Sequence, residues 1–303
     1  MNDKQNWVTM ITPFTESGDV DYSAIDEIVE WYICNGIDGI FSVCQSSEMF
    51  FLSLQEKVEI AKRVIAASNG RVPVVVSGHT SNNIDEQITE LIEMSKVGSE
   101  AVVMVTNRLA GADEDDEIWI ANAQRILEVI PNVNFGLYEC PFPYKRLLSE
   151  KIIKWCISTG RFVFIKDTCC DNELLKHRIE MLKGTDLKLF NANTTTLLES
   201  LRNGADGFCG VMLNFHPELY HYLVKHSDEL DNKKVETYQQ FATIASLIER
   251  QLYPVNAKYS MIINGIKMTY YTRSKSADDF NATMKNEVEQ LDTLWKTLKS
   301  VNE

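Results

Sequence analysis

Short apolar segments alternate with longer amphipathic segments from residue 8 to residue 210 of this 303-residue chain. The short segments are rich in β-branched residues and are bounded by turn residues, a pattern that is typical of buried strands. We expect strands at residues 8–12, 39–43, 72–77, 101–105, 134–139, 162–166, 187–191 and 207–210. The periodicity of the longer segments predicts helices at residues 22–34, 54–67, 84–96, 115–130, 149–158, 172–182 and 194–203.

Eight strands with seven intervening helices predict an α/β fold of the (β/α)8 TIM barrel type. A doubly wound open sheet is the alternative, but that fold rarely needs eight regular units, and the sequence has no Gly-x-Gly-x-x-Gly motif. After His216 the pattern is helical only, at residues 217–226, 232–251, 257–264 and 277–300. Because no linker-like stretch interrupts the chain, we treat residues 1–225 as the barrel and residues 226–303 as a C-terminal helical extension packed on it.

The composition restricts the partners of the protein. The formal net charge of −13 disfavours nucleic acid and anionic membranes, because phosphate binding needs clustered Lys and Arg side chains. The N-terminus shows no secretory signal, and no apolar segment is long enough to span a bilayer. The seven cysteines form an odd set without metal-type spacing. We therefore expect a reduced, cytoplasmic protein with no metal site and no cofactor, acting on a small molecule.

Lys166 ends the apolar run 162–165, and this position is unusual for a lysine. Charged side chains avoid strands that are buried on both faces unless they are paired or have a chemical role. Burial favours the neutral form of an amine, which is the form that attacks a carbonyl to make a Schiff base. Lys166 is therefore a candidate nucleophile.

In a barrel of this type the active site lies at the carboxyl ends of the strands. Tyr138 ends the expected strand before that of Lys166, and Ser46 and Ser47 follow the second strand. Together these positions offer an amine nucleophile, a phenol that can move protons, and hydroxyl donors for a carboxylate. The set predicts Schiff-base chemistry on an oxo acid.

Several motifs follow one another in the order and spacing of one known family. They are Thr9-x-x-Thr12-Pro13-Phe14, the turn ending in Glu48, Tyr138-x-x-Pro141, Lys166-Asp167 and Gly204-Ala205-Asp206-Gly207. Over essentially its whole length, the chain resembles the dihydrodipicolinate synthase/N-acetylneuraminate lyase family of class I, pyruvate-type aldolases. The resemblance implies a (β/α)8 barrel with a C-terminal helical extension, in a homotetramer or a homodimer.

The resemblance also assigns roles to individual residues. It implies that Lys166 condenses with the keto group of pyruvate or another 2-oxo acid. It implies that Tyr138 moves protons during imine formation and during C–C bond making or breaking. Ser46 and Ser47 occupy the positions at which the family binds the carboxylate of the 2-oxo acid.

The chain departs from the family at the positions that set substrate choice. The turn commonly reads Gly-Thr-Thr-Gly-Glu, and Gln45 aligns with the first threonine, which relays protons to the tyrosine in the synthases. An amide forms hydrogen bonds but does not pass a proton as a hydroxyl does. Residues 107–109 lack the tyrosine that the synthases use across the dimer interface, and residues 142–144 lack their substrate-binding arginine. Residues 193–196 lack the acidic pair of the sialic acid lyases.

Three further residues have open roles. Gln45 remains a candidate for substrate binding, and Arg108 is a candidate for a second anionic group because its guanidinium can bind a carboxylate bidentately. The alternative for Arg108 is a solvated loop arginine. Cys209 follows the eighth strand and is a candidate substrate contact, although a buried cysteine usually serves as small apolar packing.

The leading hypothesis is a Schiff-base lyase or aldolase that acts on a 2-oxo acid, with a 2-keto-3-deoxy sugar acid as one candidate, and that is not a standard dihydrodipicolinate synthase. A dehydratase using the same imine is the first alternative. A non-catalytic protein that binds a 2-oxo acid is the second. A third interpretation uses Glu48 and Glu139 as a glycosidase pair, which requires both carboxylates to face the cavity.

Overall fold

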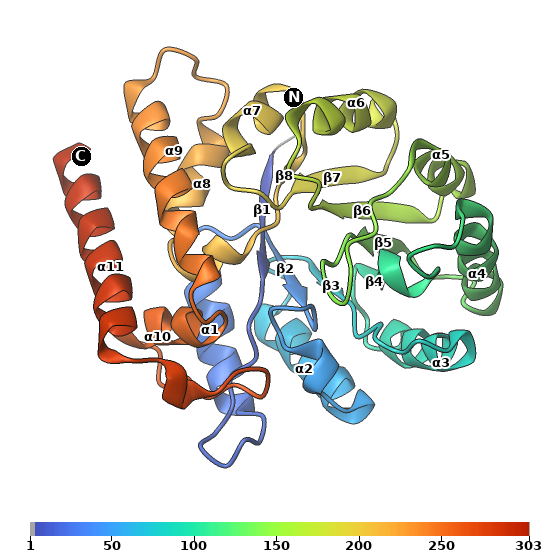
Figure 1. Ribbon diagram of the computed structural model, residues 1–303, viewed down its shortest axis with the longest axis horizontal. Helices are drawn as coiled ribbons and strands as arrows, with labels where there is room; N and C mark the ends of the chain where they lie inside the picture. Colours follow the sequence, from blue (N-terminus) through green and yellow to red (C-terminus); the bar gives the residue numbers. More distant parts are fainter. Residues whose placement is uncertain (1–3, 303) are drawn as a thin grey trace.

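The computed structural model describes residues 4–302, in which eight parallel strands close into a barrel (Figure 1). Each strand pairs with its sequence neighbours, and β8 closes the barrel on β1. The strands are β1 Gln5–Thr9, β2 Gly39–Ser42, β3 Val74–Val76, β4 Ala101–Val105, β5 Phe135–Tyr138, β6 Phe162–Asp167, β7 Lys188–Asn191 and β8 Gly207–Phe208. The predicted (β/α)8 barrel is confirmed.

The helices alternate with the strands and surround the barrel (Figure 1). They are α1 Tyr22–Cys34, α2 Leu54–Ser68, α3 Ile84–Ser95, α4 Asp116–Val129, α5 Glu150–Thr159, α6 Asn172–Leu182, α7 Leu197–Arg202 and α8 Pro217–Lys225. Three more helices follow, α9 Lys233–Ala245, α10 Val255–Ile263 and α11 Ala282–Asn302. Short 3₁₀ helices lie at Met49–Phe51, Thr106–Arg108, Val211–Asn214, Ser246–Arg250 and Ala277–Asp279.

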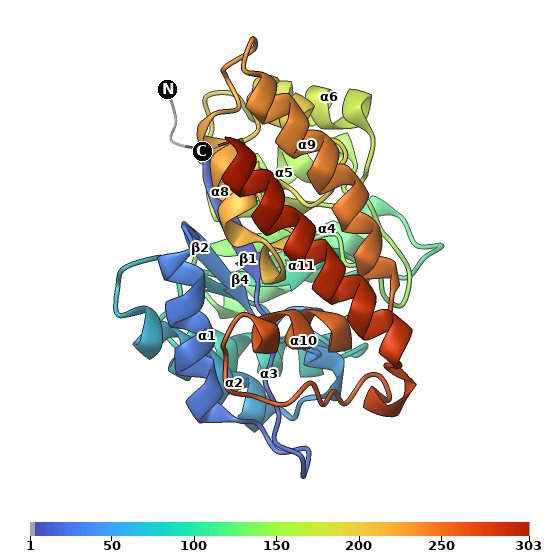
Figure 2. The same ribbon diagram turned by 90° about the vertical axis from the view of Figure 1, so that its left-hand side faces the viewer.

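The last three helices form a layer on one side of the barrel, beside α8 (Figure 2). Within this layer, Trp295 joins α11 to α9, because its ring stacks on Phe241 at 5.7 Å and meets Tyr238 edge-on at 5.0 Å. The predicted helix over residues 232–251 is wrong at its C-terminal end, where α9 stops at Ala245 and the chain tightens into the 3₁₀ helix Ser246–Arg250. No helix within residues 4–302 has the length and apolar character needed to cross a membrane.

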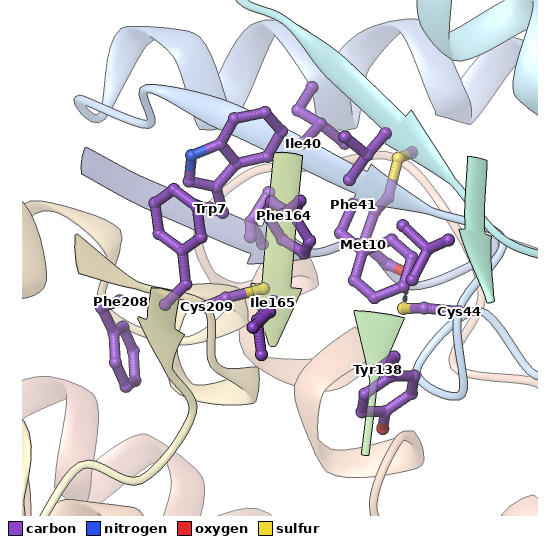
Figure 3. Packing of buried hydrophobic residues seen from close by; sticks show 14 of the residues in the cluster. Trp7, Met10, Ile40, Phe41, Cys44, Tyr138, Phe164, Ile165, Phe208 and Cys209 are labelled. Atoms are coloured by element: carbon purple, nitrogen blue, oxygen red, sulfur yellow. Dashed lines mark hydrogen bonds between the residues drawn. The ribbon is translucent and has the colours of Figure 1, made fainter. Parts of the chain in front are cut away.

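Aromatic side chains fill the inside of the barrel (Figure 3). The ring of Phe164 lies 5.2 Å from that of Trp7, 6.0 Å from that of Phe41 and 4.8 Å from that of Phe190. Phe41 in turn meets Tyr138 edge-on at 5.7 Å. Offset and edge-to-face contacts of this kind add stability beyond the area that they bury. The packed aromatic core therefore supports Tyr138 from below.

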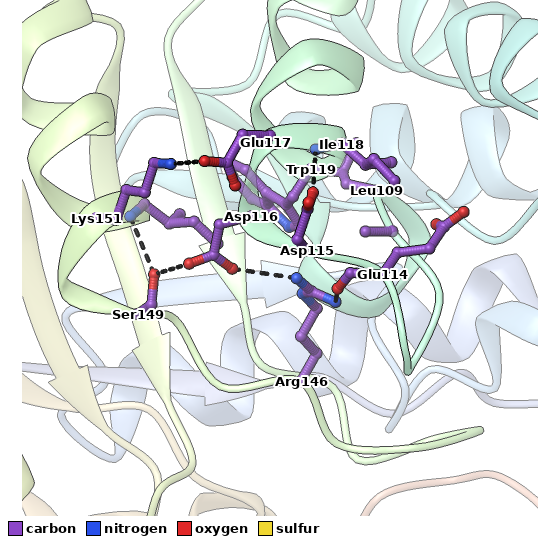
Figure 4. Close-up of polar contacts among 12 residues, drawn as sticks. Leu109, Glu114, Asp115, Asp116, Glu117, Ile118, Trp119, Arg146, Ser149 and Lys151 are labelled. Atoms are coloured by element: carbon purple, nitrogen blue, oxygen red, sulfur yellow. Dashed lines mark hydrogen bonds and ion pairs between the residues drawn. The ribbon is translucent and has the colours of Figure 1, made fainter.

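The acidic run at residues 113–117 lies at the start of α4 and connects this helix to the loop that follows β5 and to the start of α5 (Figure 4). Asp115 caps α4 by accepting the Ile118 N–H at 3.0 Å, as expected for acidic side chains at a helix N-terminus. Asp116 binds Arg146 at 3.1 Å and accepts the Ser149 hydroxyl at 2.5 Å. These contacts hold residues 146–149 in place, and the same loop carries cavity-lining residues farther upstream.

Candidate active site

Lys166 and Tyr138 are direct neighbours across β5 and β6. They are paired in the register of the two strands, so both side chains point to the same side of the sheet. The Lys166 nitrogen lies 4.3 Å from the centre of the Tyr138 ring, and only 4 % of the lysine is exposed. No hydrogen bond or ion pair within residues 4–302 engages the Lys166 amine. The amine is therefore available to a ligand.

Gln45 lies opposite Tyr138 and binds its phenol. The Tyr138 hydroxyl donates to the Gln45 side-chain oxygen at 3.2 Å, and the Cys140 thiol donates to the same oxygen at 3.3 Å. Burial raises the pKa of Tyr138 well above its ordinary value, which keeps the phenol protonated at neutral pH. Gln45 therefore orients the phenol and cannot accept its proton for transfer.

The turn after β2 presents Ser46 to the cavity and turns Ser47 away from it. The Ser46 hydroxyl donates to Thr9 at 3.2 Å and also contacts the Tyr253 phenol. The Ser47 hydroxyl donates to the Met10 carbonyl at 2.6 Å and accepts the Cys44 N–H at 3.1 Å. Of the two serines, the structure places Ser46 on the cavity wall, whereas the Ser47 side chain holds the turn together.

Two residues of this turn have a left-handed backbone. Val43 has φ 53° and Glu48 has φ 61°. This region disfavours residues with a Cβ, and most of all β-branched ones such as valine. The surrounding hydrogen bonds hold the conformation, including that from the Gly78 N–H to the Val43 carbonyl at 3.0 Å. Strained backbone of this kind clusters at ligand sites, which is consistent with a binding role for the turn.

Glu48 connects the turn to the C-terminal segment, which is the part of the chain after residue 225. Its carboxylate accepts a hydrogen bond from Lys258 at 2.9 Å and from the backbone N–H groups of Arg273 and Ser274 at 2.8 Å each. The contact with Lys258 joins residues that are 210 positions apart in the chain. Glu48 is thus occupied by structural partners, and these belong to the C-terminal segment, not to its own turn.

Glu139 and Asp167 point away from the cavity, into a buried cluster with Arg178. The Arg178 guanidinium lies 2.8 Å from Glu139 and forms a second ion pair with Asp167. Glu139 also accepts the backbone N–H groups of Leu148 at 2.7 Å and Thr168 at 2.9 Å. Burial, followed by the nearby Asp167, raises the pKa of Glu139. The glycosidase interpretation is wrong, because it requires Glu139 to face the cavity.

Arg108 and Cys209 lie outside the wall of the cavity. The Arg108 guanidinium binds the Asn82 side chain and stacks on the Phe50 ring at 5.1 Å, so it supports a cavity residue from behind. Cys209 is fully buried, and burial raises the pKa of its thiol to about 12. Sequence reasoning also placed Thr12 at the end of the first strand, but β1 ends at Thr9, and Thr12 donates to the Ser47 carbonyl at 2.9 Å.

These elements enclose a cavity of about 510 Å³ at the carboxyl ends of the strands. The reactive and polar residues on its wall include Gln45, Ser46, Tyr138, Lys166, Glu249 and Tyr253. Its size is within the range of small-molecule sites. Within residues 4–302, no group of three or more His, Cys, Asp or Glu side chains is arranged to hold a metal ion.

Sequence reasoning missed Glu249 and Tyr253. Both follow α9, in the C-terminal segment that folds back over the barrel (Figure 2). The Tyr253 phenol accepts a hydrogen bond from Asn214 at 3.3 Å and contacts the hydroxyl groups of Ser46 and Thr9. The apolar periodicity of residues 232–251 gave no sign of the 3₁₀ turn that directs Glu249 to the cavity.

His79 is a neutral structural residue under the site. The Val105 N–H donates to its Nδ1 at 3.0 Å, so Nε2 carries the proton and faces the Gln87 oxygen at 2.9 Å. Burial lowers the pKa of His79 to about 4 from an ordinary value of 6.5.

The state of His79 predicts a loss of stability in acid. As the pH falls below 6.5, His79 binds a proton in the unfolded chain, whereas in the folded protein it stays neutral until about pH 4. The contribution is therefore present above pH 6.5 and is lost as the pH falls toward 4, by roughly 3 kcal/mol. Chemical denaturation between pH 7 and 4 measures it, and His79→Gln should remove this part of the pH dependence. An identical pH dependence in the two proteins would contradict the assignment.

Comparison with known proteins places the chain among enzymes that share this fold. It matches the model of the Dihydrodipicolinate synthetase family over residues 4–291. It is 26 % identical to 4-hydroxy-tetrahydrodipicolinate synthase of Coxiella burnetii (strain Dugway 5J108-111) over 218 residues, which are 71 % of each chain.

Two solved structures illustrate the likeness in fold. YagE of E. coli K12, a prophage protein of the dihydrodipicolinic acid synthase family solved with pyruvate, superposes with a TM-score of 0.85 at 21 % identity and 98 % coverage of both chains. CdNal of Clostridium difficile, solved with mannosamine, has a TM-score of 0.84 at 17 % identity, with 97 % of this chain and 99 % of the other covered.

Proposed function

This chain belongs to the dihydrodipicolinate synthetase family, and from that premise we propose that it is a class I lyase or aldolase that acts on a 2-oxo acid through an imine on Lys166. The observation that supports this most is the pairing of Tyr138 with a buried Lys166 amine, which makes no hydrogen bond or ion pair within residues 4–302, on the wall of one cavity. A lysine held in this way suits attack on a carbonyl carbon.

The cavity wall suggests how a 2-oxo acid would lie. No backbone hydrogen bond within residues 4–302 uses the Ser46 N–H, so this group can donate to the carboxylate, and the Ser46 hydroxyl on the cavity wall can do so by turning away from Thr9. The keto carbon then faces Lys166. Attack by the amine gives a carbinolamine, and loss of its hydroxyl as water gives the imine, with Tyr138 positioned to supply the proton.

We propose that the substrate is not that of a standard dihydrodipicolinate synthase. Gln45 stands where a proton-relaying hydroxyl is expected, and it holds the phenol of Tyr138 directly. Asn107, on the loop after β4, is used to bind the carbonyls of Cys140 at 2.8 Å and Phe142 at 3.0 Å. A 2-keto-3-deoxy sugar acid is our preferred class, split to pyruvate and an aldehyde.

A second anionic group on the substrate would meet lysines, not Arg108. Lys145 and Lys275 both line the cavity, and the Lys145 nitrogen is held at 2.7 Å from the Thr168 carbonyl. Because Lys145 lies two residues beyond Pro143, it can serve the part of the cavity for which the sequence offers no arginine.

The proposed function is tested by incubating the protein with pyruvate in D2O and with a panel of 2-keto-3-deoxy sugar acids. We expect deuterium to enter the pyruvate methyl group and pyruvate to be released from at least one sugar acid. Loss of water without pyruvate release would identify a dehydratase. Tight binding of pyruvate with no exchange and no product would identify a non-catalytic binding protein.

Replacing Tyr138 by phenylalanine should lower turnover by about 10²–10³-fold, because one proton-transfer group is lost while the ring and its contacts remain. The Michaelis constant should change little, since the phenol is already engaged by Gln45. Steady-state kinetics of wild-type protein and Tyr138→Phe measure both values. Equal turnover in the two proteins would show that Tyr138 moves no proton in the slow step.

A further inference from the structure

Glu249 places a carboxylate on the wall of the cavity that contains Lys166. It lies in the 3₁₀ helix Ser246–Arg250, which follows α9 and belongs to the C-terminal segment. The register of the barrel strands has no part in placing it. Its side chain is exposed, and the space that it reaches is the cavity.

The other carboxylates near the site are already engaged. Glu48 binds Lys258 and two backbone N–H groups, and Glu139 and Asp167 share Arg178 on the far side of β5 and β6. Glu249 differs, because no hydrogen bond or ion pair within the described part of the chain involves its carboxylate. An unpartnered carboxylate and an unpartnered amine thus share one cavity.

The surroundings of Glu249 suit a group that takes and returns protons. Although its side chain reaches solvent, desolvation by the surrounding protein raises the pKa of the carboxyl, against the opposing positive charges of Lys166 and Arg250. A carboxyl with a raised pKa is a stronger base than an ordinary one, and it can also act as an acid closer to neutral pH.

One proton transfer of the imine has only Tyr138 as an acceptor among the groups described so far. An imine of pyruvate must lose a C3 proton to become the enamine that makes a C–C bond, and the enamine must regain that proton when a bond has been broken. The Tyr138 hydroxyl is protonated and donates to Gln45, whose oxygen does not pass the proton on. Tyr138 could act as this base only as the phenolate that remains after it has supplied a proton for imine formation, and its raised pKa disfavours that state.

We propose that Glu249 is the catalytic base and acid at C3 of the substrate imine. Its carboxylate oxygen takes the C3 proton as the C3–H bond breaks. The electron pair of that bond forms the C2=C3 double bond, and the C2=N π pair moves to the nitrogen and neutralises the iminium. In the cleavage direction the C3–C4 bond breaks as the C4 hydroxyl gives its proton to the Glu249 carboxylate, C4 leaves as an aldehyde, and the electron pair of the broken bond forms the C2=C3 double bond of the enamine. Protonated Glu249 then gives this proton to C3 before water releases pyruvate from Lys166.

The inference rests on the proposed imine at Lys166, and the experiment separates the two. Wild-type protein, Glu249→Gln and the control Glu173→Gln, an exposed glutamate on α6, are each given pyruvate as the probe. One portion is reduced with borohydride to measure the adduct on Lys166. Another is kept in D2O, where NMR follows deuterium entering the methyl group.

We expect Glu249→Gln to form the adduct in wild-type yield while its exchange rate falls by at least about 100-fold. Glu173→Gln should match wild type in both. If the rate of deuterium exchange is unchanged in Glu249→Gln, the proposed role of Glu249 is wrong, and the proposed imine on Lys166 is not affected. Loss of adduct and exchange together in that variant also overturns it, because Glu249 would then act before the imine. If wild-type protein shows neither the reduced adduct on Lys166 nor deuterium exchange, the proposed function itself is wrong.

Discussion

Replacing Lys166 by alanine is expected to lower turnover by about 10⁴-fold or more, because the variant loses the nucleophile and with it the covalent route. The amine of Lys166 lies over the Tyr138 and Phe41 rings, and it makes no hydrogen bond or ion pair within residues 4–302 whose loss would complicate the result. Deuterium exchange into pyruvate and pyruvate release from the active sugar acid should both disappear. The two rates are measured by NMR and by a coupled assay.

The control for Lys166→Ala is Lys176→Ala, which removes an exposed lysine of α6 and should behave as wild type. The fold should survive the Lys166 substitution, because Phe41, whose ring centre lies 6.0 Å from the lysine nitrogen, stays packed against Phe164, as Figure 3 shows for these two rings. A Lys166→Ala protein that keeps more than a few per cent of wild-type turnover would mean that another group forms the bond to the substrate.

The second large effect concerns stability, through the buried Arg178 cluster. Substituting Arg178 by methionine should lower the free energy of unfolding by about 3–5 kcal/mol, because Glu139 and Asp167 are left as buried carboxylates without a counter-charge. Both carboxylates belong to the segments that carry Tyr138 and Lys166, so activity should also fall. Chemical denaturation at fixed protein concentration measures the change.

The Arg178→Met defect should depend on pH with a defined sign. Without the guanidinium, burial and the nearby charge of Asp167 raise the pKa of Glu139 further above its unfolded value, so the folded variant binds more protons than the unfolded chain. This contribution to the stability of the variant should therefore grow as the pH falls from 8 to 5, and the deficit of the variant against wild type should shrink, because the loss that comes from His79 is the same in both proteins.

A triple variant, Arg178→Met with Glu139→Gln and Asp167→Asn, should recover part of the loss, because it removes the uncompensated charges together. If Arg178→Met alone were as stable as wild type at pH 8, the ion pairs of Arg178 with Glu139 and Asp167 would not stabilise the fold.

The barrel and the central pair of the site were predictable from local patterns. Each buried strand of a parallel barrel produces its own apolar run, and eight of them leave little choice of fold. Lys166 and Tyr138 end consecutive runs, and parallel pairing of adjacent strands brings such ends together. The mistake over Thr12 has a simple cause, since the apolar run continues past Thr9, where strand pairing stops.

The remaining parts of the site depend on contacts that leave no local signal. Glu48 binds Lys258, which is 210 residues away in the chain, and neither residue lies in a sequence pattern that predicts this contact. Glu249 reaches the cavity because α9 gives way to a 3₁₀ helix, and over one turn the two kinds of helix produce nearly the same apolar spacing. Arg108 was a reasonable candidate for binding an anionic group, because a guanidinium can bind a carboxylate. Its stacking on the Phe50 ring depends on tertiary packing, which the sequence does not reveal.

The most direct measurement for this account is to reduce a mixture of wild-type protein and pyruvate with borohydride and to locate the adduct by peptide mass spectrometry. We expect one modified site, on Lys166, and no adduct when pyruvate or borohydride is omitted. Lys57 and Lys258 are also buried and serve as internal controls, because each is held by a carboxylate away from the keto group. An adduct on either of these lysines, or a protein that stays unmodified, would contradict the central claim.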